Sequence, residues 1–369
     1  MTDPRETATS APAPARPAKI VFIDNFRAVA IFLIVAGHMY WLAFPVFPPP
    51  EGNLIYVLLN LITGGTAYFV FVSGFLYYHV FHNRLNYAEF MNKKVVNVLV
   101  PYLILGFPLA VYTMLAGSWH VSVQNGEGPV LESMFMTLVF LLTTGNMMQA
   151  YWFIPFIFCL FLMSPLFDAF IRLRRVWGWL LFGAAAAVAL VVHRPPVPDV
   201  DQIHNVLYFL PFYMFGILCA RDRTVFVRFI GRPDVLVLSG IGLIVVAAIQ
   251  ALLVGHVGNI RAQPLTPVFD FMFVQKMIGI VFFCSILHIW GQPLTGTLNH
   301  IAKLSFGVFF LHPIIGFVIG GLTDGEPPRS GNPWLDLAIY ALLVFALSLL
   351  ATSTVKLALG GRSRVVVGA

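Results

Sequence analysis

The sequence has few charged residues. Only 10% of its 369 residues are Asp, Glu, Lys or Arg, whereas 59% are apolar and the mean hydropathy is +0.85. A soluble domain usually carries about 25% charged residues, so this composition excludes a mainly water-solvated protein. The net charge of +6 comes from basic residues scattered along the chain. Because they form no basic patch, they do not indicate a nucleic-acid partner.

Cysteine is also scarce. The three cysteines, Cys159, Cys219 and Cys284, each lie in an apolar run without CxxC spacing. This pattern argues against a disulfide framework and against a zinc site, and it is typical of small apolar packing residues. His79 and His82 are one helical turn apart but have no third ligand at a convincing spacing. We therefore expect no metal cofactor.

Long apolar runs dominate the chain. A helix needs about 20 apolar residues to cross about 30 Å of hydrocarbon. The runs of suitable length are 20–44, 54–82, 95–117, 149–171, 176–193, 203–220, 235–255, 268–289, 303–322 and 334–358. The shorter run at 131–145 is expected to form an interfacial or re-entrant piece. The sequence therefore predicts an all-α polytopic membrane bundle of about ten transmembrane helices.

Polar segments flank this apolar region. Residues 1–19 are rich in Pro, Ala, Thr and Arg without an apolar period, which predicts a disordered cytoplasmic tail and not a signal peptide. Residues 20–358 are expected to form one membrane domain, and residues 359–369 a second cytoplasmic tail. No internal repeat suggests the inverted halves of a transporter.

The basic residues predict an orientation. All but four of the 22 lysines and arginines lie inside or at the inner boundary if the N-terminus is cytoplasmic. The exceptions are Arg194, Arg261 and Arg329 in outer loops, and Lys276 within the eighth run. Because cytoplasmic loops carry excess Lys and Arg, both termini are expected inside a multi-pass protein of the cell (inner) membrane.

The first apolar run holds three ionisable residues on one stripe. Arg27 and His38 are eleven positions apart, which brings them within about 20° of each other on a helix, and Asp24 lies about 60° from Arg27. His38 would sit about 16 Å deeper than Arg27, about halfway across the bilayer. Ionisable groups at such depths are expensive and usually functional.

Each of these three residue types has a chemical use. Histidine is the usual general base near neutral pH, Arg27 could hold an anionic group, and Asp24 at i−3 could orient it. The alternative is structural. In that interpretation Asp24 and Arg27 form an ion pair at the membrane rim, and His38 is hydrogen-bonded inside the bundle.

Six sequence blocks carry a family resemblance. The first, FIDNFRAVAIFLIVAGH, contains the pattern D-x2-R-x10-H at Asp24, Arg27 and His38. It is followed in order by FVFVSGF at 69–75, KKVVNVLVPYL at 93–103, YWFIPFIFCL at 151–160, FLPFYMFGIL at 209–218 and LSFGVFFLHP at 304–313. Over about residues 20–358 the chain resembles the membrane acyltransferase 3 family (acyl_transf_3), the O-acyltransferases of cell-envelope glycans.

The resemblance implies an enzyme that takes an acyl group from cytoplasmic acyl-CoA. It delivers the group to a hydroxyl at or beyond the membrane, on a cell-envelope glycan or its lipid-linked precursor, or less often on a small metabolite. Acetyl-CoA is the expected co-substrate. Succinyl-CoA is the main variant, because its extra carboxylate would give Lys276 a partner. The resemblance implies His38 as the catalytic residue, together with Asp24 and Arg27.

A site for the CoA phosphates is also implied. Many relatives carry an R-x-x-R pair where this chain has Lys93, Lys94 and Asn97. Arg27, Lys93 and Lys94 are the expected phosphate ligands, although lysine acts as a point charge without the bidentate fork. The departure at Asn97 puts a phosphate contact there in doubt. Alternatively, Lys93 and Lys94 are anchors at the cytoplasmic boundary.

Four further residues are candidates for substrate contacts. His312, which precedes Pro313, could line a cavity opposite His38 or bond a carbonyl that the proline frees. Lys276 must snorkel outward or meet an anion of the acceptor or acyl group. Tyr151 and Trp152 start the fourth run, where either an aromatic belt or a platform for stacking on sugars is expected.

Small residues predict close helix contacts, at Ser73 and Gly74 and again at Ser305 and Gly307. A rival function remains for the whole chain. A transporter of polar solutes or lipid-linked sugars would also need charges inside the membrane and kinked helices. Dependence on acyl-CoA distinguishes the two, because a transporter moves its substrate without consuming a thioester.

Overall fold

A computed structural model describes residues 20–44, 54–81, 86–116, 131–195, 201–255, 260–261, 268–323 and 326–369. Across these ranges the regular structure is helical, and the β-pairing consists of one isolated bridge between Arg194 and Ile260. Eight helical segments are long and apolar enough to cross a membrane. The predicted all-α polytopic bundle is therefore confirmed.

The helices follow one another in this order: α1 Val21–His38, α2 Tyr40–Ala43, α3 Ile55–Ile62, α4 Thr66–Phe81, α5 Tyr87–Lys94, the π-helical η1 Val95–Leu99, α6 Val100–Ala116, α7 Leu131–Thr144, α8 Phe153–Leu162, α9 Ser164–Arg172, α10 Arg175–Ala189, α11 Gln202–Arg221, α12 Arg223–Ile230, α13 Pro233–Leu253, α14 Phe271–Trp290, α15 Thr295–Leu322, α16 Pro333–Leu359, the 3-10 turn η2 Gly360–Arg362 and α17 Ser363–Val367.

The number of candidate spans is lower than the sequence predicts. The described residues hold eight, or nine if α8 and α9 form one span with a bend of 52°. The predicted run at 176–193 corresponds to α10, whose 15 residues extend only about 22 Å. That length falls short of the hydrocarbon thickness, which accounts for the difference from about ten.

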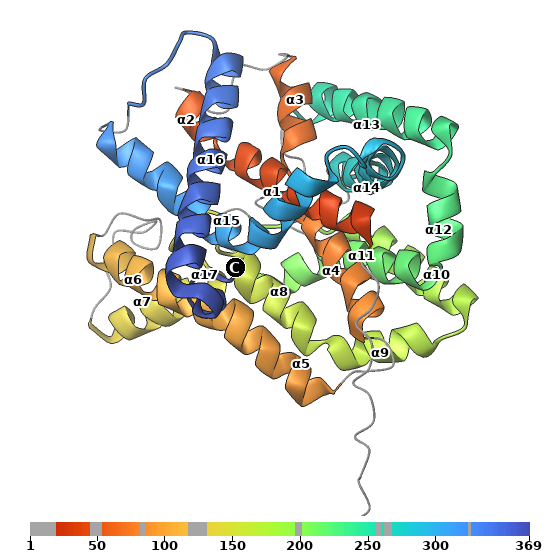
Figure 1. The fold of residues 1–369 in the computed structure, drawn as a ribbon, viewed down its shortest axis with the longest axis horizontal. Helices are drawn as coiled ribbons and strands as arrows, with labels where there is room; N and C mark the ends of the chain where they lie inside the picture. The colour runs from red at the N-terminus through yellow and green to blue at the C-terminus, as the bar shows by residue number, and fades with distance from the viewer. Residues whose placement is uncertain are drawn as a thin grey trace, which may run out of the picture.

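Helix α1 lies inside the bundle. It packs against α4, α14, α15 and α16, and Figure 1 shows it between them, with α13 and α12 at one edge and α6 and α7 at the opposite edge. The outer helices expose apolar side chains such as Leu252 and Leu253 of α13, as expected of surfaces that face lipid. The ionisable residues of α1 therefore face protein and not lipid.

Glycines bring α4 and α11 into close contact. A Cβ atom at Gly74 would lie 2.1 Å from the carbonyl oxygen of Tyr213, and one at Gly216 would lie 2.2 Å from that of Phe71. Only a residue without a side chain lets two backbones approach this closely. At Gly307 a Cβ would meet Thr352 of α16 at 2.3 Å. The close contacts predicted at Gly74 and Gly307 are confirmed.

The end of the chain packs into the bundle. Residues 359–369, which the sequence analysis treats as a tail, include the short helix α17, and α17 contacts α6, α15 and α16. Val367 and Ala369 are buried. The segment therefore contributes to the protein interior, because its run of valines buries apolar surface. The predicted tail at 1–19 lies outside the described residues.

We predict that Gly74→Ala destabilises the fold. The added methyl group has no space against the Tyr213 carbonyl, and overpacking of this kind costs about 1–3 kcal/mol. Thermal unfolding of the purified protein in detergent measures the effect. Gly183→Ala on the exposed face of α10, where nothing lies within 4 Å of the new atom, is the matched control and should unfold at or above the wild-type temperature. Equal midpoints for Gly74→Ala and wild type would contradict the close packing.

Candidate active site

Two cavities lie at the two ends of the ionisable stripe on α1. The His38 cavity has a volume of about 570 Å³, and its polar lining includes His38, Arg194 and Lys276. The Arg27 cavity has a volume of about 380 Å³ and is lined by Arg27, Lys94 and a set of mainly aromatic side chains. Both volumes lie in the range of small-molecule sites.

The hydrogen bonds of His38 assign its tautomer. Nδ1 lies 2.7 Å from the carbonyl oxygen of Ile34, and because a carbonyl only accepts, Nδ1 carries the proton. The other ring nitrogen, Nε2, then holds a lone pair. His38 lines the cavity at the last residue of α1. A neutral imidazole with a free Nε2 is the form that a general base requires.

His312 lies directly beside His38. Its Nδ1 is 3.1 Å from the carbonyl oxygen of Val308, and its Nε2 is 3.4 Å from Nδ1 of His38. Val308 accepts the Nδ1 proton of His312, so Nε2 of His312 accepts a weak second hydrogen bond from His38. The buried His312 thereby helps to hold the His38 ring. Within the described residues no group of three potential metal ligands occurs.

Arg27 connects α1 to α15. Its Nη2 and Nε donate to the hydroxyl of Ser305 at 2.8 and 3.3 Å, and the guanidinium lines the Arg27 cavity. Asp24 acts electrostatically on Arg27 from one turn away and lines neither cavity. The small residue Ser305 is thus a hydrogen-bond partner as well as a packing residue.

Lys93 and Lys94 point to different places. Lys94 lines the Arg27 cavity, and its Nζ lies 4.1 Å from the ring centroid of Phe161. Lys93 is exposed and forms an ion pair with Glu89 one turn away. The structure therefore places only Lys94 beside Arg27. Asn97 also lines this cavity from the π-helical turn η1, and π-turns occur frequently at functional sites.

Lys276 caps the end of α3. Its buried Nζ donates to the carbonyl oxygens of Asn60 at 2.8 Å and Leu61 at 3.2 Å. These carbonyls belong to the last turn of α3, where helical partners run out and a cation is favoured. The lysine also lines the His38 cavity. The sequence predicted that Lys276 would snorkel outward or meet an anion. In the structure its ammonium is instead bound by carbonyl oxygens of another helix.

Tyr151 and Trp152 also differ. Tyr151 is fully buried, donates its hydroxyl hydrogen to the carbonyl oxygen of Phe310 at 3.0 Å, and lines neither cavity. Tyr151 therefore lies neither on the protein surface nor on the wall of either cavity. Trp152 is half-buried and lines the His38 cavity.

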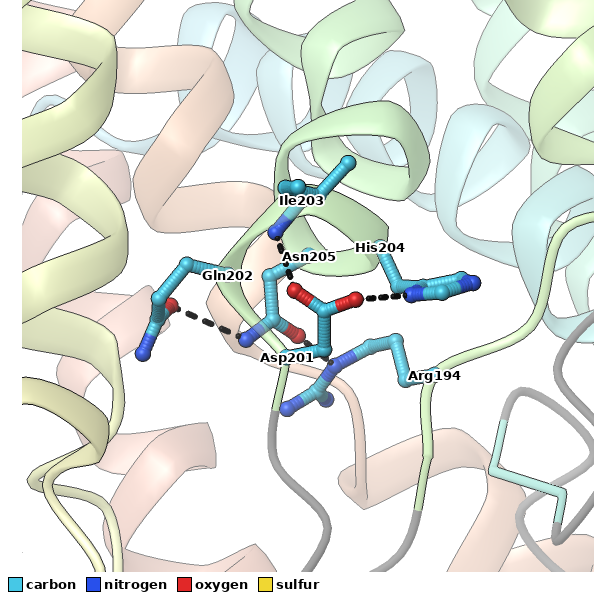
Figure 2. A network of polar contacts seen from close by, with 6 residues as sticks. All are labelled: Arg194, Asp201, Gln202, Ile203, His204 and Asn205. Atoms are coloured by element: carbon cyan, nitrogen blue, oxygen red, sulfur yellow. Dashed lines mark hydrogen bonds and ion pairs between the residues drawn. The ribbon is translucent and has the colours of Figure 1, made fainter. Parts of the chain in front are cut away.

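Arg194 is a cavity residue that the sequence analysis does not identify as a site residue. It lies in the loop after α10, and its Cζ is 3.7 Å from the centroid of the Trp152 ring. Nε donates to Oδ1 of Asn205 at 2.6 Å, as Figure 2 shows. Burial lowers the pKa of Arg194 to about 10, so the guanidinium stays charged at neutral pH. It lies in a loop next to a proline run, outside any periodic segment, so the sequence pattern did not mark it as a site residue.

A tight turn closes one wall of the His38 cavity. Gly145 and Ala150 have φ values of 76° and 70°, and both residues line the cavity. Positive φ is uncommon for a residue other than glycine and marks local strain. At Gly145 a Cβ would lie 2.3 Å from the backbone nitrogen of Trp152. The turn therefore packs directly against the backbone of Trp152, which lines the same cavity.

Two aromatic side chains connect the wall of the Arg27 cavity to the histidine pair. Phe153 lines the Arg27 cavity, and its ring centroid lies 5.3 Å from that of Phe309. The ring of Phe309 in turn lies 5.9 Å from that of His312. We call Phe153 and Phe309 the aromatic partition. Its two rings form a line of contacts from the Arg27 cavity to His312.

The fold and the site define a class of protein. It is a polytopic membrane protein in which His38 lines one cavity, and Arg27 and Lys94 line another. The family model described as an acyltransferase domain (Acyl_transf_3) matches residues 20–353. The chain therefore belongs to this family and is a membrane acyltransferase, as the sequence blocks predict. No curated protein and no solved structure matches the chain significantly.

We predict that Lys276→Met lowers the thermal stability of the protein. The substitution leaves the Asn60 and Leu61 carbonyls without their donor, at a cost of about 1–3 kcal/mol. The unfolding midpoint in detergent measures it. Lys303→Met, on the exposed part of α15, removes the same charge and should leave the midpoint unchanged. An unshifted midpoint for Lys276→Met would show that the α3 terminus does not depend on the ammonium.

Proposed function

We propose that this protein is an O-acyltransferase that moves an acyl group from cytoplasmic acyl-CoA to a hydroxyl of a cell-envelope glycan or its lipid-linked precursor. Acetyl is the proposed acyl group, with succinyl as the variant. The observation that carries the proposal is the arrangement of His38, whose Nε2 is free while Nδ1 is held by Ile34 and His312. Membership of the acyltransferase family supports it.

His38 is the proposed general base. Its Nε2 accepts the proton of the acceptor hydroxyl while the hydroxyl oxygen attacks the carbonyl carbon of the thioester. The carbon–sulfur bond then breaks, the acyl group stays on the acceptor oxygen as an ester, and the proton passes from Nε2 to the sulfur of CoA. In a second version Nε2 attacks the thioester first and forms a transient acyl-imidazole, which the acceptor then cleaves.

The Arg27 cavity is the proposed entry for acyl-CoA. Arg27 and Lys94 provide two positive charges for the CoA phosphates, and the aromatic lining suits an uncharged pantetheine arm. If both termini are cytoplasmic, as the basic residues predict, this cavity faces the cytoplasm and the His38 cavity faces the outside.

The thioester must pass the aromatic partition to reach His38. The rings of Phe153 and Phe309 are therefore proposed to turn aside when the acyl-pantetheine arm enters, a motion available to side chains without movement of the helices. A transporter would also need a closed partition between two cavities. The acyltransferase family supports the enzyme, and consumption of the thioester separates the two functions.

We predict that His38→Ala abolishes acyl transfer from radiolabelled acetyl-CoA, because loss of a general base typically costs 10²–10⁴-fold. The assay uses the purified protein in detergent with envelope extract as the source of acceptor, and it is repeated with succinyl-CoA. CoA binding should persist, since the Arg27 cavity is unaffected.

The control for this assay is His300→Ala, an exposed histidine of α15, which should retain full activity. Turnover by His38→Ala would overturn the assignment of the base. If the wild-type protein consumes neither thioester, the transporter becomes the better explanation. Label that remains covalently on the protein without acceptor would favour the acyl-imidazole version.

We predict that the adjacent lysines differ in their effect on CoA binding. Lys94→Gln should weaken the binding of CoA about tenfold, because a charge-assisted contact contributes about 1.5 kcal/mol or more. Lys93→Gln removes the same charge from an exposed ion pair and should change the affinity by less than about twofold. Calorimetric titration with CoA measures both. Equal losses would indicate a general charge effect and not a site at Lys94.

A further inference from the structure

Arg194 offers an unused pair of donors to the His38 cavity. The only hydrogen bond of its side chain in the described part of the chain runs from Nε to Asn205. The terminal nitrogens Nη1 and Nη2 have no partner there, and they are not among the buried polar atoms without partners. They are therefore accessible, and the cavity is the space that Arg194 lines.

The guanidinium of Arg194 lies against two aromatic rings. Its Cζ lies 3.7 Å from the Trp152 ring centroid and 5.2 Å from that of Phe209, and the two rings are stacked at 20°. Stacking of this kind fixes the plane of an arginine and leaves its edge free. Two parallel N–H groups at that edge match a carboxylate or a phosphate.

No acidic side chain neutralises Arg194 within the described residues. The carboxylate that Figure 2 shows nearby, Asp201, instead accepts from the backbone of Ile203 and pairs with His204. A buried arginine without a counter-ion is costly. An anion in the cavity would offset that cost.

The backbone around Arg194 is anchored and not free to swing away. The carbonyl oxygen of Arg194 accepts from the backbone nitrogen of Arg261 at 2.9 Å, and that of Leu190 accepts from Asp270 at 3.0 Å. The side chain of His193 bonds the carbonyl of Val268 at 3.0 Å. The arginine is thus a fixed element of the cavity wall, as a binding site requires.

We propose that the His38 cavity binds an acceptor that carries an oxyanion, a carboxylate or a phosphate, and that Arg194 recognises this group with its two terminal nitrogens. The anion then positions a hydroxyl of the same molecule at Nε2 of His38. This inference rests on the proposed function, because it assigns the cavity to the acceptor. Lys276 contributes less, since two of its three donors already bind Asn60 and Leu61.

The anion site at Arg194 suits the acceptor better than the acyl donor. The anionic part of acyl-CoA fits the Arg27 cavity, at the other end of α1 and beyond the aromatic partition. An anion bound at Arg194 therefore belongs to a molecule that enters from the His38 side. Arg194 and His38 line the same cavity, so the anion and the reacting hydroxyl would occupy one binding site.

The test uses matched pairs of probes and needs no acyl-CoA. Calorimetric titration of the full-length protein in detergent compares a glucuronate-containing trisaccharide with its carboxyl-reduced neutral form. A second pair compares a glycerol phosphate oligomer with glycerol. We expect one acidic probe to bind at least about tenfold more tightly than its neutral partner, because only the acidic probe forms charged hydrogen bonds with Arg194. The pair that shows the difference identifies carboxylate or phosphate.

Four variants assign the difference to Arg194. Arg194→Gln should remove the preference for the acidic probe. Asn205→Asp, which brings a carboxylate to the guanidinium without removing it, should reduce the preference even if Arg194→Gln fails to fold. Arg329→Gln, an exposed outer-loop arginine, and Lys94→Gln should keep it.

Several outcomes overturn the proposal. These are equal binding of acidic and neutral probes, no binding of either acidic probe, or a preference that survives in both Arg194→Gln and Asn205→Asp. Loss of the preference in Lys94→Gln alone would move the anion to the Arg27 cavity and also overturn it. Because binding is measured without thioester, a preference that depends on Arg194 in a protein that consumes no acyl-CoA would contradict the enzyme and not the anion site.

Discussion

Three polar contacts hold α1 against α15. One joins Asn25 to Thr295, and the arrangement of the site depends on the other two. Inside an apolar bundle a polar side chain must find its partner within the protein, and here Arg27 meets Ser305 while His38 meets His312. The residue numbers rise together on the two helices, so α1 and α15 run parallel. The spacing on α1 corresponds to about 16 Å and that on α15 to about 10 Å, and the long Arg27 side chain covers the difference. Together these contacts hold Arg27 and His38, which line the two cavities, against α15.

Much of this could be predicted from local patterns. Apolar length marks most of the spans, because the bilayer sets a minimum for each helix. The stripe of Asp24, Arg27 and His38 follows from helical periodicity alone, and the close approach at Gly74 follows from the small size of the residue. Each of these patterns is visible within one segment of the sequence. Family membership adds the chemistry, which neither periodicity nor composition contains.

The remaining site geometry depends on contacts between distant segments. Lys276 is satisfied by carbonyls of α3, more than 200 residues earlier in the chain. The neighbours Lys93 and Lys94 diverge because one meets Glu89 and the other turns toward the cavity at the start of a π-turn. Arg194 joins the site through Trp152, which precedes it by about 40 residues. Sequence spacing within a single element reveals none of these partners.

The aromatic partition also bears on the permeability of the membrane. A continuous wet path from the Arg27 cavity to the His38 cavity would conduct protons and small ions and so dissipate the electrochemical gradient that the cell maintains. The rings of Phe153 and Phe309 offer no polar group to a hydrated ion, whose transfer into such surroundings costs many times the thermal energy. A thioester arm is uncharged and meets a far smaller barrier. In the proposed function, the same two side chains insulate the bilayer and still admit the acyl group.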